Sequence, residues 1–305
     1  MEPELPNRPS PPPLLVLVGP TASGKTALAL QVAEASGGEI ISADSVQVYR
    51  GFDIGAGKPT LAERTRVPHH LIDVADPGEP MDAASWVVLA DRAVADIRAR
   101  GRLPVVCGGT FLWVRALLFG LAEAPPADPL VRERHRALAE AEGRGAVHAA
   151  LAKVDPPRAA RLSPNDLIRV SRALEVYELT GTPQTEWHAR HGFREHRHAA
   201  RLVGIQWTAD ELSLRIEARA RAMLDAGLLD EVRRLVSHGH GNARAMQSVG
   251  YRQAAEALEG NAVDAAALES AIVRATRIFA RRQRTWLRDQ PVEWLTPADV
   301  SRFTG

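Results

Sequence analysis

The chain has 305 residues, a formal net charge of +1 and charged side chains at 25% of its positions. A chain of this length can bury a full hydrophobic core, and we expect two lobes. The balanced charge excludes a histone-like polycation. A single cysteine, Cys107, excludes a disulfide framework and any zinc site built on cysteines.

Residues 1–13 differ in composition from the rest of the chain. They hold six prolines, two acids and one arginine, and they lack the basic and apolar regions of a signal peptide. We therefore expect a disordered leader. No apolar run approaches the ~20 residues of a membrane-spanning helix. We expect a cytoplasmic protein with no membrane partner and, because nothing demands a dimer, a monomer.

A phosphate-binding pattern, G-x-x-x-x-G-K-T, follows the apolar run 14–18 and leads into a helix. Its residues are Gly19, Pro20, Thr21, Ala22, Ser23, Gly24, Lys25 and Thr26. Glycines let the backbone wrap a phosphate, and N–H groups at a helix N-terminus point at the anion. Lys25 adds positive charge, and the Thr26 hydroxyl is placed to ligate Mg²⁺. The motif predicts a di- or triphosphate site with Mg²⁺ as cofactor.

Strands and helices alternate through the first part of the chain. Strands are expected at 14–18, 39–42, 71–74 and 103–107. Helices are expected after the phosphate-binding motif, over 83–100, and from 111 to about 118. This alternation predicts an α/β fold with a P-loop NTPase-like core and a central parallel sheet.

The pattern becomes entirely helical after the proline-rich stretch 124–129. The expected helices are 130–142, 145–153 and 164–179, the last with Ser163 as N-cap and Pro164 as its first residue. A strand at 201–207 returns the chain to the sheet. The expected later elements are helices at 210–226, 228–237, 250–259 and 263–288, and a short run at 292–295. We expect a core domain of 14–123 and 190–305, a helical insertion domain at 124–189, and a helical C-terminal part.

Two polar groups follow strands at the edge of the sheet where open α/β folds bind ligands. Asp44 comes shortly after the strand 39–42, and its carboxylate is a general base, a metal ligand through water, or a turn cap. Gly108-Gly109-Thr110 repeats the strand–turn–helix arrangement of the phosphate-binding motif. It either brings a hydroxyl to the same edge or forms a tight turn capped by Thr110. Asp73 fits a core-edge or capping role.

The C-terminal helix carries a stripe of arginines spaced by three and four residues. Its members are Arg274, Arg277, Arg281, Arg284 and Arg288. Such spacing places them on one helix face, where like charges repel unless an anion lies nearby. A nucleic-acid backbone is the favoured partner, and a solvated face is the alternative. Two smaller arginine pairs, Arg215 with Arg219 and Arg169 with Arg172, have similar spacing. The histidines show no clear ligand spacing and are expected on the surface or as caps.

Several stretches resemble the tRNA dimethylallyltransferases. They are residues 19–26, 41–49, 52–55, 68–73, 108–110, 249–253 and 282–288. The similarity covers roughly residues 14 to 295. The Asp-Ser-x-Gln-x-Tyr stretch at 44–49 and Val-Gly-Tyr-Arg-Gln at 249–253 carry most of the specificity. At 55–59, Gly-Ala-Gly-Lys-Pro departs from the family's usual Thr-Ala before the lysine, and the zinc-finger extension of eukaryotic members is absent.

The resemblance implies transfer of a dimethylallyl group from dimethylallyl diphosphate to N6 of adenosine 37, beside the tRNA anticodon, in tRNAs that read codons beginning with U. Asp44 would accept the N6 proton, and Thr110 would lie near the reacting centre. Arg215 and Arg219 would join the phosphate-binding motif in holding the diphosphate. The expected contacts with the anticodon stem-loop are Asp44, Ser45, Val46, Gln47, Thr110, Arg132, Ile168, Arg169, Val170, Ser171, Arg172, Gln247, Ser248, Val249, Gly250, Tyr251, Arg252, Arg281, Arg282, Gln283, Arg284, Thr285, Trp286, Leu287 and Arg288.

Two other functions remain open from the residues. A P-loop small-molecule kinase would use Asp44 to bind an acceptor hydroxyl, with 124–185 as a lid. It would not need an arginine-striped terminal helix. A non-catalytic, nucleotide-gated RNA-binding module would leave Asp44 without a chemical task.

Overall fold

The computed structural model describes residues 13–193, 195–260 and 263–304. Within them the chain divides into two compact units, one of 13–118 and 198–304 and the other of 119–197. The second unit contains the whole range 124–189 expected as an insertion, and it also takes in 119–123 and 190–197. Apart from Pro13, the expected leader lies outside the described residues.

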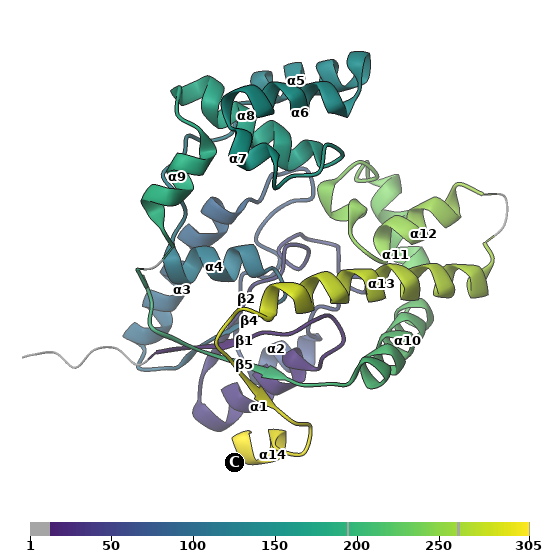
Figure 1. Ribbon diagram of the computed structural model, residues 1–305. Coiled ribbons are helices and arrows are strands. Elements are labelled where there is room, and N and C mark those ends of the chain that lie inside the picture. Colours follow the sequence, from purple (N-terminus) through teal and green to yellow (C-terminus); the bar gives the residue numbers. More distant parts are fainter. Residues whose placement is uncertain (1–12, 194, 261–262, 305) are drawn as a thin grey trace, which may run out of the picture. The chain divides into compact units, whose positions relative to one another are not determined.

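The first unit is built on a six-stranded parallel sheet with strand order β3-β2-β4-β1-β5-β6 (Figure 1). The strands are β1 (Leu14–Leu17), β2 (Glu39–Ser42), β3 (His69–His70), β4 (Pro104–Cys107), β5 (Ala200–Ile205) and β6 (Val292–Leu295). Every residue of β1, β2 and β4 is buried, as expected for central strands of a parallel sheet. The expected α/β class with a parallel sheet is confirmed.

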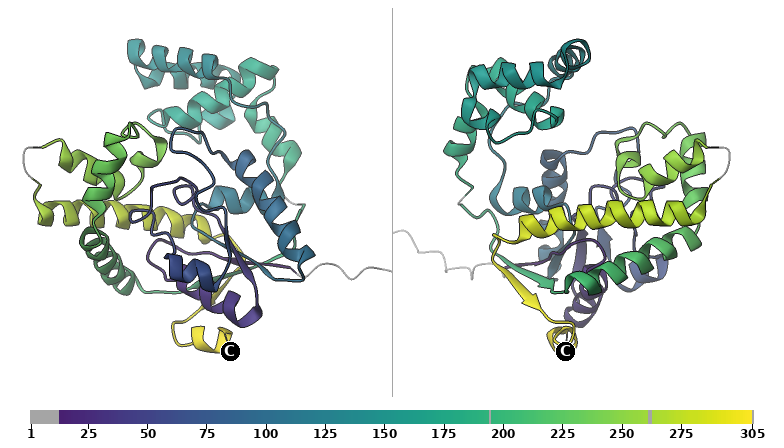
Figure 2. Two further views of the ribbon diagram at one scale, coloured as in Figure 1. Left: turned by 180° about the vertical axis from the view of Figure 1, so that it is seen from behind. Right: turned by 45° about the vertical axis from the view of Figure 1, so that its right-hand side comes forward.

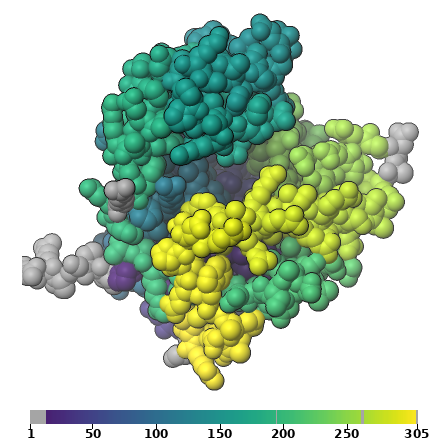
Figure 3. Space-filling model, viewed as in Figure 1, coloured from purple at the N-terminus to yellow at the C-terminus, as the bar shows by residue number. Residues whose placement is uncertain are grey.

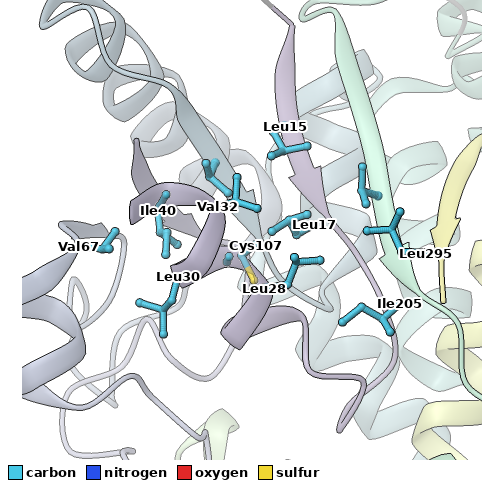
Figure 4. Close-up of a cluster of buried hydrophobic side chains, with 14 residues drawn as sticks. Leu15, Leu17, Leu28, Leu30, Val32, Ile40, Val67, Cys107, Ile205 and Leu295 are labelled. Carbon is cyan, nitrogen blue, oxygen red and sulfur yellow. The ribbon is translucent and has the colours of Figure 1, made fainter. Parts of the chain in front are cut away.

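Helices surround this sheet in the first unit. They are α1 (Lys25–Ser36), α2 (Leu61–Arg66), α3 (Ala83–Ala99), α4 (Phe111–Phe119), α10 (Ala209–Asp225), α11 (Leu228–Ser237), α12 (Tyr251–Leu258), α13 (Ala265–Leu287), α14 (Val300–Thr304) and the 3₁₀ helix Arg244–Gln247. One apolar cluster joins α1 to the sheet and includes Leu28, Leu17, Cys107 and Ile205 (Figure 4). This cluster fixes the start of α1 against the carboxyl ends of the strands.

The longest helix, α13, packs along α10 and also contacts α12 (Figure 2). Buried residues recur along it from Leu268 to Leu287, at a helical period. The exposed positions of the same helix carry its arginines. The helices α10, α12 and α13 therefore form a group beside the sheet.

The secondary structure described in the second unit is entirely helical. They are α5 (Pro129–Glu142), α6 (Arg144–Val154), α7 (Pro156–Ala159), α8 (Leu167–Thr180) and α9 (Gln184–His191). Its own apolar cluster includes Val147, Leu151, Val170 and Leu174. No helix in the described part of the chain is long and apolar enough to cross a membrane.

The predictions for one strand and for the start of one helix are wrong. Residues 71–74 do not form a strand, because Leu71 and Asp73 have φ of 63° and 58°, in the left-handed region; the pairing strand is His69–His70 instead. The helix expected from Ser163 begins at Leu167, capped by Asp166, whose carboxylate accepts from the N–H of Arg169. The short helices α2, α7, α9 and α14 were not expected.

Candidate active site

The phosphate-binding loop leaves β1 and turns directly into α1. Ala22 and Gly24 have φ of 68° and 88°, which curls the loop back over the helix start. No described side chain caps α1, so its first-turn N–H groups remain available to an anion. The hydroxyl of Ser23 is buried and has no hydrogen-bond partner among the described residues. The loop thus offers unsatisfied donors to a ligand.

Two side chains that are distant in the sequence hold this loop from outside. The indole N–H of Trp207 donates to the carbonyl of Ser23 at 2.8 Å. Arg215, on α10, donates from Nε to the carbonyl of Ala22 at 2.7 Å. Its guanidinium lies 4.3 Å from the centroid of the Trp207 ring. Arg215 therefore supports the loop, and Trp207 is a supporting residue that the sequence analysis missed.

Lys25 is largely enclosed beneath the loop. Burial lowers the pKa of Lys25 below the ordinary lysine value; the nearby Asp44 carboxylate partly offsets this effect, and the charge of Arg219 adds to it. Burial also raises the pKa of the Cys107 thiol to about 11. A buried, desolvated ammonium gains most when a negatively charged ligand arrives.

A cavity of about 490 Å³ opens beside the loop. Its polar lining includes Lys25, Thr26, Asp44, Arg215 and Arg219. Burial lowers the pKa of Arg219, and the charge of Asp44 works against that shift. The cavity therefore combines helix N–H groups, a hydroxyl and enclosed cations, which suits a diphosphate.

Asp44 stands where β2 ends, beside the turn that follows β4. Its Oδ1 accepts from the N–H groups of Val46 at 2.9 Å and Gln47 at 3.3 Å. The next residue, Ser45, donates its N–H to Thr110 Oγ1 at 3.0 Å. Among the described residues no donor reaches Oδ2. The carboxylate is thus held through one oxygen and free at the other, as a proton acceptor needs.

A second cavity, of about 690 Å³, reaches the same carboxylate. The two cavities share Thr21, Lys25, Asp44, Ala56 and Arg219. The larger one is walled by α10, α12 and α13, with Arg252, Arg274, Arg282 and Phe279 in its lining. The structure therefore brings Asp44 between an anion-binding cavity and a larger space edged by arginines.

The stretch 247–252 divides between this cavity and the interior. Gln247, Ser248, Val249 and Arg252 line the cavity. Gly250 and Tyr251 are buried, which leaves them no surface for direct RNA contact in this structure.

Tyr251 has a different role. Its hydroxyl donates to Glu231 Oε1 at 2.5 Å and accepts from the N–H of Ala56 at 3.1 Å. Glu231, which is also buried, accepts the N–H groups of Ile54 and Gly55 at 2.8 and 3.3 Å. This pair fixes the loop that borders both cavities, and the sequence analysis missed Glu231.

The residues of the C-terminal half of α13 are divided between two cavities and the interior. Part of this helix lies at the surface of the first unit (Figure 3), and its arginines are exposed. Arg282 and Gln283 line the large cavity. A third cavity, of about 370 Å³, is lined by Arg281, Arg284, Thr285, Leu287, Arg288, Trp207 and Trp294, among others. Leu287 is 1% exposed, and Trp286 stacks on Phe111 at 4.4 Å, so both pack within the fold.

The arginine stripe is not a single row of free charges. Arg277 pairs with Glu217 of α10 and donates to Ser213. By contrast, Arg281, Arg284 and Arg288 are exposed and have no ion-pair partner among the described residues. A local acid therefore already pairs with one expected member, while the last three remain accessible to an anionic partner.

The remaining expected RNA contacts lie in the second unit. Ile168 and Arg169 are exposed, whereas Val170 and Ser171 are buried, and Ser171 Oγ lies 2.9 Å from His135 Nδ1. Arg132 and Arg172 both pair with the buried carboxylate of Glu175. Their charges thus balance an interior acid.

Asp73 is a structural ion-pair partner. It pairs with Lys58 at 2.5 Å and Arg64 at 2.8 Å, and Lys58 is 2% exposed. Among the described residues, no group of three or more histidine, cysteine, aspartate or glutamate side chains could hold a metal ion. Any metal here would therefore take most of its ligands from a bound phosphate and water.

A parallel α/β fold with a phosphate-binding loop, beside a carboxylate and an arginine-edged cavity, defines the class of P-loop proteins. Family models described as isopentenyl transferase and IPP transferase match residues 12–72 and 47–290. The chain belongs to this family, the tRNA dimethylallyltransferases, which confirms the resemblance in its sequence.

Individual relatives agree with this. The chain is 63% identical to a tRNA dimethylallyltransferase of Sorangium cellulosum, over 94% of this chain and 91% of the relative. It is 52% identical to one of Anaeromyxobacter dehalogenans, over 93% and 95%.

Two solved structures are also similar. A tRNA isopentenylpyrophosphate transferase of Bacillus halodurans matches with a TM-score of 0.69 and 35% identity, over 96% of this chain and 94% of that one. A eukaryotic dimethylallyltransferase acting on tRNA matches with a TM-score of 0.75 and 26% identity, over 95% and 75%.

Proposed function

We propose that this protein transfers a dimethylallyl group from dimethylallyl diphosphate to N6 of adenosine 37 in tRNA, releasing diphosphate. The observation that carries the proposal is the position of Asp44 at the meeting of the two cavities. One cavity suits a diphosphate and the other is edged by arginines that suit RNA. We propose that the substrates are tRNAs reading codons that begin with U.

In this reaction the bond between the allylic carbon and the diphosphate oxygen breaks, and a bond from N6 to that carbon forms. Negative charge grows on the leaving diphosphate, where the loop N–H groups, Lys25 and Arg219 stabilise it. Asp44 orients the amino group through its free oxygen and takes its proton. The adenosine must leave the anticodon loop to reach this carboxylate.

We propose that Mg²⁺ accompanies the diphosphate. Thr26 lines the anion cavity and would hold the ion, and the buried Ser23 hydroxyl in the same loop has no partner among the described residues. Bound Mg²⁺ would neutralise part of the charge of the leaving diphosphate. We further propose that the protein acts as a cytoplasmic monomer, since one chain supplies the P-loop, Asp44 and the arginines.

One assay tests the function. The protein is incubated with Mg²⁺, dimethylallyl diphosphate and unmodified tRNA, and the tRNA is digested and searched for N6-prenyladenosine. We expect product that depends on both substrates. Absence of product together with phosphate transfer from ATP would instead establish a P-loop kinase. Specific tRNA binding with no chemistry on either substrate would establish a non-catalytic RNA-binding module.

A further inference from the structure

Gln283 is a buried polar residue in a helix segment otherwise rich in exposed arginines. It is 4% exposed, whereas its neighbours Arg281, Arg282 and Arg284 are exposed. A buried amide is stable only when both its carbonyl and its amino group have partners. Its two hydrogen bonds therefore carry structural information.

Both partners of Gln283 are backbone groups of ligand-binding loops. Its Oε1 accepts from the N–H of Thr21, in the phosphate-binding loop, at 2.8 Å. Its Nε2 donates to the carbonyl of Gly109, in the turn after β4, at 3.1 Å. One side chain thus joins two loops that are far apart in the sequence.

The turn at Gly109 leads directly to the acceptor carboxylate. The next residue, Thr110, accepts from the N–H of Ser45 at 3.0 Å and donates its own N–H to the carbonyl of Ala43 at 3.1 Å. Asp44 lies between Ala43 and Ser45 in the chain. A continuous set of hydrogen bonds therefore runs from the diphosphate loop through Gln283 to the backbone on both sides of Asp44.

The bridge depends on the absence of a side chain at Gly109. A Cβ built there would lie 2.6 Å from Gln283 Nε2. No other atom comes closer to that Cβ than 3.8 Å, and its backbone is outside the left-handed region. A methyl group at 109 would thus displace the amide without straining the turn.

We propose that Gln283 is a positioning residue that fixes the diphosphate loop relative to Asp44. This inference rests on the proposed function. The phosphate-binding loop holds the leaving group, and Asp44 orients the nucleophile. The distance between the loop and Asp44 therefore decides whether N6 can reach the allylic carbon. A displacement of about 1 Å in such an arrangement can slow a reaction by about 10²-fold. Both ends of the amide are held by backbone groups, so the structure gives Gln283 a role that requires no contact with RNA.

A double-mutant cycle tests the bridge. The four proteins are wild type, Q283A, G109A and G109A/Q283A. Single-turnover rates are measured at saturating dimethylallyl diphosphate and tRNA, with separate Kd values for pyrophosphate and tRNA. Each single change should slow transfer by about 10- to 100-fold, while the tRNA Kd stays within about twofold. Because both changes break the same bridge, the double variant should be no slower than the slower single variant.

L268A serves as the stability control. Leu268 is buried near the start of the same helix and lines none of the three described cavities. It should lower Tm without slowing transfer at saturation.

Any of three results would contradict the proposed role of Gln283. The first is a double variant whose loss of rate equals the product of the two single losses. The others are single variants that react at the wild-type rate, or variants that lose only tRNA affinity. If the wild-type protein transfers no prenyl group, the proposed function fails. In that case the pyrophosphate Kd values of the same four proteins test the bridge. The double variant should then bind pyrophosphate no more weakly than the weaker of the two single variants.

Discussion

The guanidinium of Arg219 lies directly against Gly57. A Cβ added at Gly57 would come 2.5 Å from Arg219 Nη2, and the backbone there has φ of 60°. Arg219 comes from α10 and Gly57 from the loop that Glu231 and Tyr251 hold. The loop therefore provides the space in which this cation of the smaller cavity sits.

Gly57→Ala should displace Arg219 and weaken pyrophosphate binding. The change also forces alanine into a left-handed conformation, which costs about 1 kcal/mol. Gly37→Ala is the matched control, because Gly37 has φ of 62° and nothing lies within 4 Å of the position that an added methyl group would take. Both variants should lose similar stability in thermal unfolding, but only G57A should raise the pyrophosphate Kd in calorimetry. Equal pyrophosphate affinity in the two variants would show that Arg219 does not contact the anion.

Asp44→Asn should slow prenyl transfer by about 10²–10⁴-fold with little change in tRNA affinity. The amide oxygen of asparagine can still accept from the N–H groups of Val46 and Gln47, so the turn is retained. Only the ability to take a proton is lost. Single-turnover kinetics with a parallel tRNA binding measurement separates the two effects. Weaker binding at an unchanged rate would make Asp44 a recognition residue only.

The sequence contained the local parts of the site. Each of the phosphate-binding motif, Asp44 and Thr110 follows a predicted strand. Because parallel strands end at the same edge of a sheet, the sequence predicts that these groups lie near one another at that edge. These predictions depend on short segments, and the residue pattern within each segment is nearly sufficient to predict its local structure. The structure places Ser45 and Thr110 in direct hydrogen-bond contact.

The errors came from contacts between distant segments. Residues 71–74 have an apolar, strand-like pattern, yet Asp73 is turned toward Lys58 and Arg64, and its backbone is left-handed. Trp207, Tyr251 and Gln283 each have a hydrogen-bond partner far along the chain, at separations of 184, 195 and 262 residues respectively. No local period encodes such pairs, so the supporting roles of these three residues could not be predicted from the sequence.

Neutralising Arg281 and Arg284 together should weaken tRNA binding and flatten its salt dependence. Each lost phosphate contact lowers the slope of log K against log salt by about 0.7–0.9. Arg277→Gln, on the same helix, is the control because Glu217 already pairs with this arginine. We expect R281Q/R284Q to reduce the slope by about 1.5 and R277Q to leave it nearly unchanged. An unaltered slope in the double variant would place these arginines away from the RNA.

Lys25 should make pyrophosphate binding sensitive to pH. Burial lowers its pKa from the ordinary value of 10.5, and only the protonated amine attracts the anion. Raising the pH through the lowered pKa removes that charge, so affinity should fall before an ordinary lysine would titrate. The guanidinium introduced by K25R stays protonated throughout, so the affinity of this variant should lack the fall. If the affinity of wild type and of K25R changed with pH in the same way, the pH dependence would belong to another group or to pyrophosphate itself.

Tyr251→Phe should loosen the loop that carries Gly57. The change leaves the Ala56 N–H without its partner and removes a donor from the buried Glu231, a loss of about 1–3 kcal/mol in the free energy of unfolding. Tyr49→Phe is the matched control, since Tyr49 is also buried and its hydroxyl accepts from the N–H of Met81 at 3.1 Å. Chemical denaturation should show destabilisation in both variants. Only Y251F should also weaken pyrophosphate binding, because only that loop confines Arg219; an equal loss in Y49F would mean that general instability, and not the loop, controls the anion site.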